Sequence, residues 1–204
     1  MPPIDRRNPR QQRSLERVDA ILKSAASLIS EQGGGSLKMS AVAERAGVST
    51  ASIYQYFPNT TEIVRALAKT YAEHFRGAIK QHLQQIHSAE DLITHTKSMF
   101  YEFCEMYRND PALKEIGLAT ALDKSLQELD VLDSRENTAL LFQAYQPYFA
   151  KESWAELQRL LFLMCHLSGA TIRLALTLDE GEGNLLLETH QQMLEARFLD
   201  LMQL

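Results

Sequence analysis

Cysteine and long uninterrupted apolar runs are scarce in this 204-residue chain. Cys104 and Cys165 have no C-x-x-C spacing and no secretory signal peptide precedes them, so we expect a cytoplasmic protein with reduced thiols. Both are expected to be small core residues rather than redox switches. The longest apolar stretch, residues 160–178, contains His166, Arg173 and three hydroxyl side chains, which favours a buried helix over a membrane span.

Recognisable catalytic and metal-binding motifs are also lacking. The six histidines, two cysteines and 26 acidic residues form no H-E-x-x-H motif, no cysteine cluster and no nucleophile motif. Asp91 and His95 share a helix face, which is not persuasive as a metal site. The sequence therefore predicts no catalytic residues, no metal and no cofactor.

Charge is distributed unevenly along the chain. The net charge is −5, yet residues 1–60 carry eight Lys/Arg against five Asp/Glu, and the remainder carries thirteen against twenty-one. This asymmetry is typical of a nucleic-acid reader joined to a second module, because only the reader must attract phosphates. Since 45% of the residues are hydrophobic and 23% are charged, the chain can build a substantial core.

The most informative segment is residues 39–58, MSAVAERAGVSTASIYQYFP, which predicts two short helices crossing at a tight turn. Gly47 supplies the positive φ that the turn needs, and Ala43 allows the second helix to approach closely. Ser49 is placed to cap that helix by accepting a backbone N–H. Five apolar side chains are expected to meet between the helices: Val42, Ala46, Val48, Ile53 and Phe57. The pattern favours DNA binding, with a buried helical hairpin as the alternative.

Helical periodicity continues outside this motif, without repeats or convincing strands. A helix is expected over residues 14–32, and one starting at Thr60 or Thr61 should run roughly 35 to 40 Å. Further helices are predicted near residues 92–107, 113–118, 126–145, 153–177 and 185–201. Ser153 and Glu156 form a predicted capping box, and residues 179–184 a predicted turn. The expected fold is all-α with about nine helices.

Three parts of the chain are predicted from these elements. Residues 1–13, with three prolines and four arginines, are expected to form a flexible basic arm that either touches DNA or is an inert tail. Residues 14–59 should form a helix-turn-helix DNA-binding domain. Residues 60–204 should form a ligand-binding and dimerisation domain.

The motif resembles that of the TetR family of bacterial transcriptional regulators, over roughly residues 14–66. The matching residues are Ala46-Gly47-Val48-Ser49, Ile53-Tyr54 and Tyr56-Phe57-Pro58-Asn59. The resemblance implies a homodimer that binds a palindromic operator, most often as a repressor, and a carboxy-terminal pocket whose small-molecule effector releases the DNA. Competing interpretations are a metal- or redox-responsive regulator and a DNA-binding protein without an effector.

Two positions depart from the family pattern. Thr60 stands where a lysine is common, which removes a phosphate contact, although its hydroxyl is suited to cap the following helix. The aromatic residue often found before the second helix is absent from residues 33–35, which are all glycine. We therefore expect weaker or differently salt-dependent DNA binding rather than its loss.

Helical geometry predicts which side chains of the motif meet DNA. Thr50, Ala51, Tyr54 and Gln55 share one face, while Ile53 points to the supporting helices. The Gln55 amide both donates and accepts, as an adenine edge requires, and Ala51 or the Thr50 methyl suits thymine methyls; a solvated glutamine is the alternative. Additional contacts are predicted for Lys38, Ser40, Ser49, Ser52, Tyr54, Tyr56 and Thr60, with Tyr56 alternatively part of the core and Arg45 alternatively only solvated.

The second domain is rich in large, adaptable and aromatic side chains, which suits an apolar or aromatic effector. His166 and Arg173 lie in an otherwise apolar helix and need partners, either a ligand or an internal acid. The predicted ligand contacts are Met99, Phe100, Phe103, Cys104, Tyr107, Phe142, Tyr145, Phe162, His166 and Arg173. Ordinary core packing is the alternative for most of them.

The last two helices are the predicted dimer surface. Residues 168–170, Ser-Gly-Ala, permit close backbone approach. The apolar residues assigned to this surface are Leu185, Leu186, Met193, Leu194, Phe198, Leu201 and Met202, with monomer core as the alternative. A two-fold dimer would place two reading helices about 34 Å apart, matching successive major grooves.

Overall fold

The computed structural model describes residues 9–203 and contains nine α-helices within that range. They are α1 (Pro9–Gln32), α2 (Met39–Arg45), α3 (Thr50–Tyr54), α4 (Thr60–Leu83), α5 (Ala89–Asn109), α6 (Pro111–Leu122), α7 (Lys124–Tyr145), α8 (Trp154–Ala175) and α9 (Glu180–Gln203). Short 3-10 helices cover Gly34–Ser36, Gln146–Tyr148 and Lys151–Ser153. The described residues contain no strand, which confirms the all-α prediction. None of these helices is long and apolar enough to cross a membrane.

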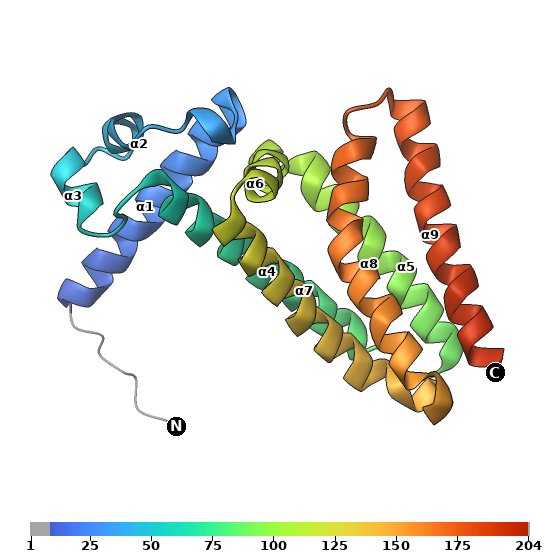
Figure 1. Cartoon of the computed structure of the whole chain (residues 1–204). Coiled ribbons are helices and arrows are strands. Elements are labelled where there is room, and N and C mark those ends of the chain that lie inside the picture. The colour runs from blue at the N-terminus through green and yellow to red at the C-terminus, as the bar shows by residue number, and fades with distance from the viewer. Residues whose placement is uncertain (1–8, 204) are drawn as a thin grey trace.

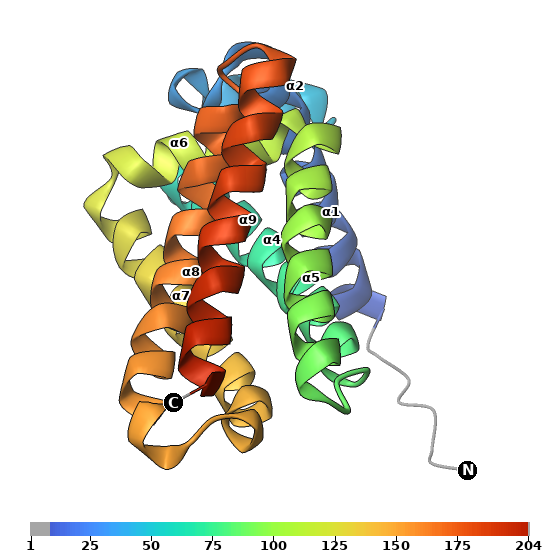
Figure 2. The same ribbon diagram turned by 90° about the vertical axis from the view of Figure 1, so that its right-hand side faces the viewer.

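The helices form a small head and a larger bundle. In Figure 1, α1, α2 and α3 gather at one end of the molecule, and α4 runs from them into the group formed by α5–α9. Figure 2 shows α9 in front of this group, with α5 and α8 on either side of it. A single long helix therefore connects the helix-turn-helix motif to the second group of helices.

The core of the head extends into α6. Ile21, Ile53 and Ile63 are fully buried in one cluster with residues of the first four helices. Ala112 and Ile116 of α6 belong to the same cluster. Because interiors are close-packed, a displacement of α6 must be accommodated by the head.

Two helices begin earlier than the sequence predicted. Helix α1 begins at Pro9 rather than Ser14, because proline is tolerated in the first turn and the glutamines and arginine that follow favour helix. The prediction of a flexible arm is therefore wrong for residues 9–13, while residues 1–8 lie outside the described part of the chain.

Helix α9 begins at Glu180, so the predicted turn over residues 179–184 is mostly helix. The Asp179 side chain accepts a hydrogen bond from the Glu182 N–H at 3.0 Å and thus satisfies the first turn. Gly183 lies inside this helix. A Cβ at this position would stand 2.4 Å from the Ala175 carbonyl oxygen, which is why the helix has glycine here. Glycine is therefore needed here for the close packing of α9 on α8 and does not indicate a turn.

Two predicted helix caps are also corrected. Ser153 precedes α8, but its side chain makes no capping bond, because it ends a 3-10 turn with helical φ and ψ of −86° and −9°. Glu156 is paired with Arg197 instead. At the start of α4 the cap is Asn59, whose Oδ1 accepts from the Glu62 N–H at 3.0 Å, so Thr60 is the first helical residue and not the cap.

Candidate nucleic-acid interface and ligand cavity

The turn between α2 and α3 has the predicted geometry. Gly47 has a φ of 65°, and the Val48 N–H donates to the Ala43 carbonyl at 3.0 Å across the turn. The Ser49 hydroxyl caps α3 by accepting from the Ser52 N–H at 3.2 Å. Ile53 is fully buried, which anchors α3 against the head. These contacts fix the direction of a helix of only five residues.

Four side chains of this segment point away from the head. Thr50, Ala51, Tyr54 and Gln55 are all exposed, and we call them the reading face. Tyr54 is 54% exposed and is one of the large apolar side chains of the described chain that face solvent. Helix α3 lies at the outer edge of the molecule, away from α5–α9 (Figure 1). The reading face is therefore accessible to a large partner.

The other predicted DNA contacts surround the reading face unequally. Lys38 and Ser40 are exposed at the start of α2. The side chains of Ser49 and Ser52 are hydrogen-bonded to each other, with 3.0 Å between their hydroxyl oxygens. Tyr56 and Thr60 are half-buried, and Tyr56 packs against the core of the head. Lys38 and Ser40 are therefore accessible to DNA, whereas Tyr56 and Thr60 are only partly accessible.

Two basic residues near the interface make contacts that the sequence did not indicate. Arg45 is not simply solvated: it pairs with Glu31 at 2.9 Å and donates to Ser27 at 2.8 Å, which ties α2 to α1. Sequence analysis missed Arg17, an exposed cation beside Tyr56. A hydrogen bond from Ser14, together with one from Arg17, lowers the pKa of Tyr56. The helical periodicity of α1 was the available signal for Arg17, because that residue falls on its polar face.

Two internal spaces lie in the second group of helices. The narrow cavity holds about 50 Å³ and includes Phe75, Met99, Phe100 and Phe103 in its lining. The second, which we call the α6 hollow, holds about 390 Å³ and is lined by residues of α4, α5, α6, α7 and α8. Organic ligands occupy sites of about 300–1,000 Å³, so of these two spaces the α6 hollow has the size of an effector site. A further space of about 490 Å³ adjoins it between α4 and α7, but half of its lining residues are charged, which does not suit an apolar ligand.

The structure brings six of the ten predicted ligand contacts to these spaces. Phe103 lines both spaces, Met99 and Phe100 line the narrow cavity, and Tyr107, His166 and Arg173 line the α6 hollow. The lining that sequence analysis missed includes Tyr71 and Phe75 of α4 and Gln127 of α7. Nothing in the sequence pattern distinguished these residues from ordinary core or surface positions.

The other four predicted contacts, Cys104, Phe142, Tyr145 and Phe162, line neither space. Tyr145 is fully buried and lies 2.6 Å from the Thr96 hydroxyl. The Phe142 ring packs on Trp154 with 5.9 Å between centroids. Cys104 and Tyr145 are buried core residues and Phe142 packs against the core, whereas Phe162 is partly exposed and stacks on His166. Aromatic composition does not indicate which side of a helix faces a cavity.

The two polar residues of α8 have different partners. His166 Nδ1 lies 3.1 Å from the Ser134 hydroxyl and 3.6 Å from Asp130, so it has an internal acid. Arg173 donates to the Tyr107 hydroxyl at 3.2 Å and, within residues 9–203, pairs with no carboxylate. The ligand alternative therefore stays open for Arg173.

The cysteines and histidines do not converge on a common centre. Burial raises the pKa of Cys104 to about 11 and that of Cys165 to about 12, which keeps both thiols protonated and poorly nucleophilic at neutral pH. His95 lies 3.0 Å from His82, while Asp91 accepts from the His87 N–H. Between Pro9 and Gln203, no three His, Cys, Asp or Glu side chains are arranged to hold a metal ion.

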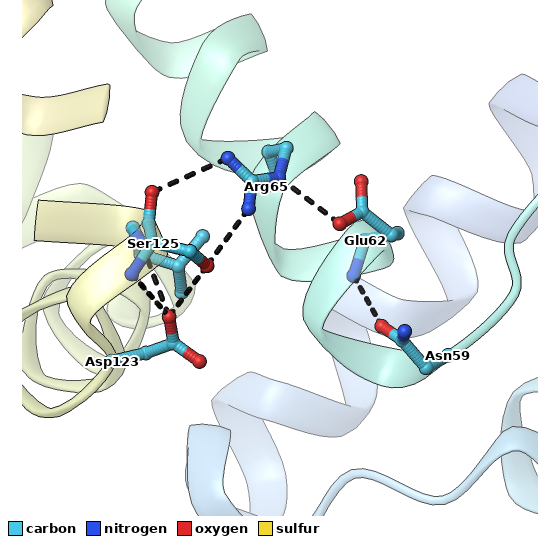
Figure 3. A network of polar contacts seen from close by, with 6 residues as sticks. Asn59, Glu62, Arg65, Asp123 and Ser125 are labelled. Atoms are coloured by element: carbon cyan, nitrogen blue, oxygen red, sulfur yellow. Dashed lines mark hydrogen bonds and ion pairs between the residues drawn. The ribbon is translucent and has the colours of Figure 1, made fainter. Parts of the chain in front are cut away.

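Helix α6 is attached to α4 at both of its ends. At the first end, the Tyr71 hydroxyl donates to Asp110, the cap of α6, at 2.5 Å. At the other end, Arg65 donates to the Ser125 hydroxyl at 2.8 Å, and Asp123 accepts from the Ser125 N–H at 2.8 Å (Figure 3). A wall of the α6 hollow is thereby coupled to α4, the helix that directly follows the helix-turn-helix motif.

The exposed apolar side chains of α8 and α9 differ from the predicted dimer surface. Phe198 and Leu201 are fully buried in the monomer, and Ser168 is also buried, so these assignments are corrected to core. Leu186, Leu194 and Met202 are partly buried, whereas Leu185 and Met193 are exposed as predicted. The exposed set, which we call the α8–α9 face, is Leu163, Leu167, Leu174, Leu185, Met193 and Leu199. Periodicity alone did not separate the inward side of α9 from its outward side.

Comparisons with known proteins agree with this architecture. The sequence-family model described as tetracyclin repressor-like, C-terminal domain, matches residues 87–202. The family model described as bacterial regulatory proteins, tetR family, matches residues 21–67. The chain is 27% identical over 143 residues to YvdT of Bacillus subtilis, an uncharacterized HTH-type transcriptional regulator. That match covers 69% of this chain and 63% of YvdT, so it spans less than two thirds of the relative.

Solved structures share the fold over nearly the whole chain. A TetR-family transcriptional regulator from Streptomyces coelicolor superposes with a TM-score of 0.72 at 22% identity, covering 92% of this chain and 97% of that one. RolR in complex with resorcinol superposes with a TM-score of 0.64 at 16% identity, covering 94% and 95%. At these identities the likeness concerns the fold.

Proposed function

Because this chain belongs to the TetR family of bacterial transcriptional regulators, we propose that it represses transcription by binding a palindromic operator as a homodimer. We further propose that a small apolar or aromatic effector releases it from the DNA. The observation that carries the proposal is the position of Ile116, which lines the α6 hollow and is buried in the core of the head. One helix thus contacts both the effector site and the DNA-binding unit.

The reading face supports the DNA-binding part of the proposal. Gln55 presents an amide that both donates and accepts, as the major-groove edge of adenine requires, and Ala51 presents a methyl group suited to thymine. Tyr54 carries a hydroxyl on a rigid stem, which suits a phosphate oxygen. Lys38 and Arg17 add exposed positive charge beside these groups. We assign base recognition to Gln55 and backbone positioning to the tyrosine and the cations.

The α8–α9 face supports a dimer. Leu174 and Met193 are 54% and 68% exposed, and such large apolar side chains on adjacent antiparallel helices are costly to leave in water. One head alone buries too little surface for tight specific binding, whereas two heads related by a two-fold axis meet two half-sites. Dimerisation is therefore part of the proposed mechanism.

The coupling runs through α6 and α4. An effector that occupies the α6 hollow displaces Ile116 and its helix, and the bonds of Tyr71 and Arg65 transmit that displacement to α4. Because α4 follows the motif directly, its tilt changes the separation of the two reading faces in a dimer. The effector can change operator affinity only by its preference between the two states, commonly about 1–3 kcal/mol.

The DNA-binding part is tested by selecting bound duplexes from a random pool with the full chain. We expect an inverted repeat to be enriched, and we expect Gln55→Ala to weaken binding to it by roughly 10- to 100-fold at the contacted base pair. Gln143→Ala, an exposed glutamine on α7, is the matched control. Light scattering must report the same dimer mass for all three proteins. Failure to enrich any sequence would reject the proposal, and dissociation of the Gln55 variant would show that this side chain is misassigned.

A further inference from the structure

The guanidinium of Arg173 has no opposite charge beside it within the described residues. Other half-buried arginines of the second domain are paired: Arg65 with Glu62, and Arg76 with Asp133 and Glu136. Arg173 instead donates to the neutral hydroxyl of Tyr107 at 3.2 Å and forms no ion pair between residues 9 and 203. A half-buried cation loses part of its hydration, and no opposite charge among the described residues replaces it here, so this position requires another explanation.

The surroundings of Arg173 hold its side chain in one place. A Cβ at Gly117 of α6 would lie 2.8 Å from Arg173 Nη1, and a Cβ at Gly169 of α8 would lie 3.2 Å from it. Tyr107 is buried, with 6% of its surface exposed. The guanidinium therefore lies between α6 and α8 at a wall of the α6 hollow, in contact with a buried phenol.

Arg173 and Tyr107 together suit a carboxylate. A guanidinium presents parallel N–H donors that match the two oxygens of a carboxylate. The Tyr107 oxygen accepts from Arg173, and among the described residues its own proton has no acceptor, so that proton is free to donate to a bound anion. Both groups line the hollow and therefore act on the same ligand atoms.

The remaining walls define the other end of such a ligand. Phe75 and Phe103 stack with 4.1 Å between ring centroids, and both line the hollow, which provides an apolar surface. Asp130 and Asp133 of α7 also line it and repel a second negative charge. Asp133 is already held by Arg76, and Asp130 lies 3.6 Å from His166. A ligand with one negative end and a neutral body gives Arg173 an opposite charge and places no second negative charge near these carboxylates.

We propose that the effector is a small monocarboxylic acid with an aromatic or aliphatic body, whose carboxylate binds Arg173 and the Tyr107 hydroxyl. This inference rests on the proposed function, because it takes the α6 hollow as the effector site. It goes beyond it by naming the charge, the anchoring pair and the orientation of the ligand.

Calorimetry with matched pairs tests the charge requirement. The pairs are benzoate and benzyl alcohol, 2-naphthoate and 2-naphthalenemethanol, and octanoate and 1-octanol, with terephthalate as a dianion. We expect at least one acid to bind roughly 10- to 100-fold more tightly than its alcohol, and terephthalate to bind more weakly than benzoate. Equal binding within every pair, preference for the alcohols, tighter binding of terephthalate than of benzoate, or no binding by any acid overturns the proposal.

Variants then locate the anion. Arg173→Gln should abolish the preference for the acid, Arg173→Lys should retain part of it, and Arg159→Gln, an exposed arginine on the same helix, should leave it unchanged. Melting curves identify a variant that fails to fold, and the comparison of acid with alcohol in the unaltered protein does not depend on any variant. A folded Arg173→Gln protein that still prefers the acid overturns the assignment.

Operator binding separates the two proposals. If the alcohol releases the selected duplex as well as the acid does, the effector mechanism stands and the carboxylate inference fails. If the acid binds through Arg173 but does not change operator affinity, the site stands and its regulatory role fails.

Discussion

The guanidinium of Arg65 donates to two atoms of Ser125, to the hydroxyl at 2.8 Å and to the carbonyl oxygen at 3.3 Å. Arg65 lies in the second turn of α4, and Ser125 is the second residue of α7. The pair therefore joins the helix that leaves the motif to the helix that follows α6 (Figure 3). It is one of the polar links through which the proposed effector site can act on the head.

A double-mutant cycle measures this link. Arg65→Met and Ser125→Ala should each lower the free energy of unfolding by about 1–2 kcal/mol, because each removes a partly buried hydrogen bond to a charged group. The two effects should be coupled by about 1 kcal/mol, since the second change removes a bond already lost. Urea titrations of the four proteins provide the values. Strictly additive losses would show that the two side chains act independently.

The local features of the motif were predictable because neighbouring residues determine them. The positive φ of Gly47, the cap of Ser49 and the burial of Ile53 each depend on a few positions in sequence. Contacts such as Arg65 with Ser125, separated by 60 positions, depend on how whole helices pack. No spacing rule relates such residues, so the link between head and bundle was not predictable.

The ligand and dimer assignments failed in part for a related reason. Helix α9 is apolar around much of its circumference, so the pattern could not assign Phe198 to the core and Met193 to the outside. Arg173 was recognisable from the sequence as a charged residue in an apolar helix. That it meets Tyr107 of α5 and Gly117 of α6, and no acid within the described chain, depends on how the helices pack. A sequence can mark a residue as unusual without indicating what lies opposite it.

Charge on the α8–α9 face should separate the proposed dimer. Leu174→Glu and Met193→Glu each place a carboxylate on this face, and the two-fold axis duplicates it, so dissociation should become at least roughly 30-fold more favourable. Sedimentation equilibrium measures the dissociation constant. Leu122→Glu is the control, because Leu122 is 89% exposed at the end of α6, outside the α8–α9 face. If the control dissociates the dimer and the two other variants do not, the interface lies elsewhere.

Acidification should destabilise the protein through His190. Burial lowers the pKa of His190 below its ordinary value of 6.5, and its Nε2 lies 3.3 Å from the buried Ser168 hydroxyl. The unfolded chain therefore binds a proton more readily than the folded one, so this contribution to stability is intact above pH 6.5 and declines as the pH falls below it.

Urea midpoints measured between neutral pH and about pH 5 test this sign, since a histidine titrates across that range. His190→Gln should flatten the decline, whereas His87→Gln, which replaces an exposed histidine, should not change it. An unchanged slope in the His190 variant would mean that other groups cause the decline.

Two helical glycines should respond in opposite directions to the same substitution. At Gly183 of α9 an added Cβ would lie 2.4 Å from the Ala175 carbonyl oxygen, which is backbone and cannot rotate away. Gly183→Ala should therefore cost about 1–3 kcal/mol of unfolding free energy by forcing α8 and α9 apart. At Gly77 of α4 the added Cβ meets no atom within 4 Å, so Gly77→Ala should gain about 0.5–1 kcal/mol from its better helix propensity. Thermal and urea unfolding of both variants give the comparison, and a stabilised Gly183 variant would contradict the close packing of α9 on the end of α8.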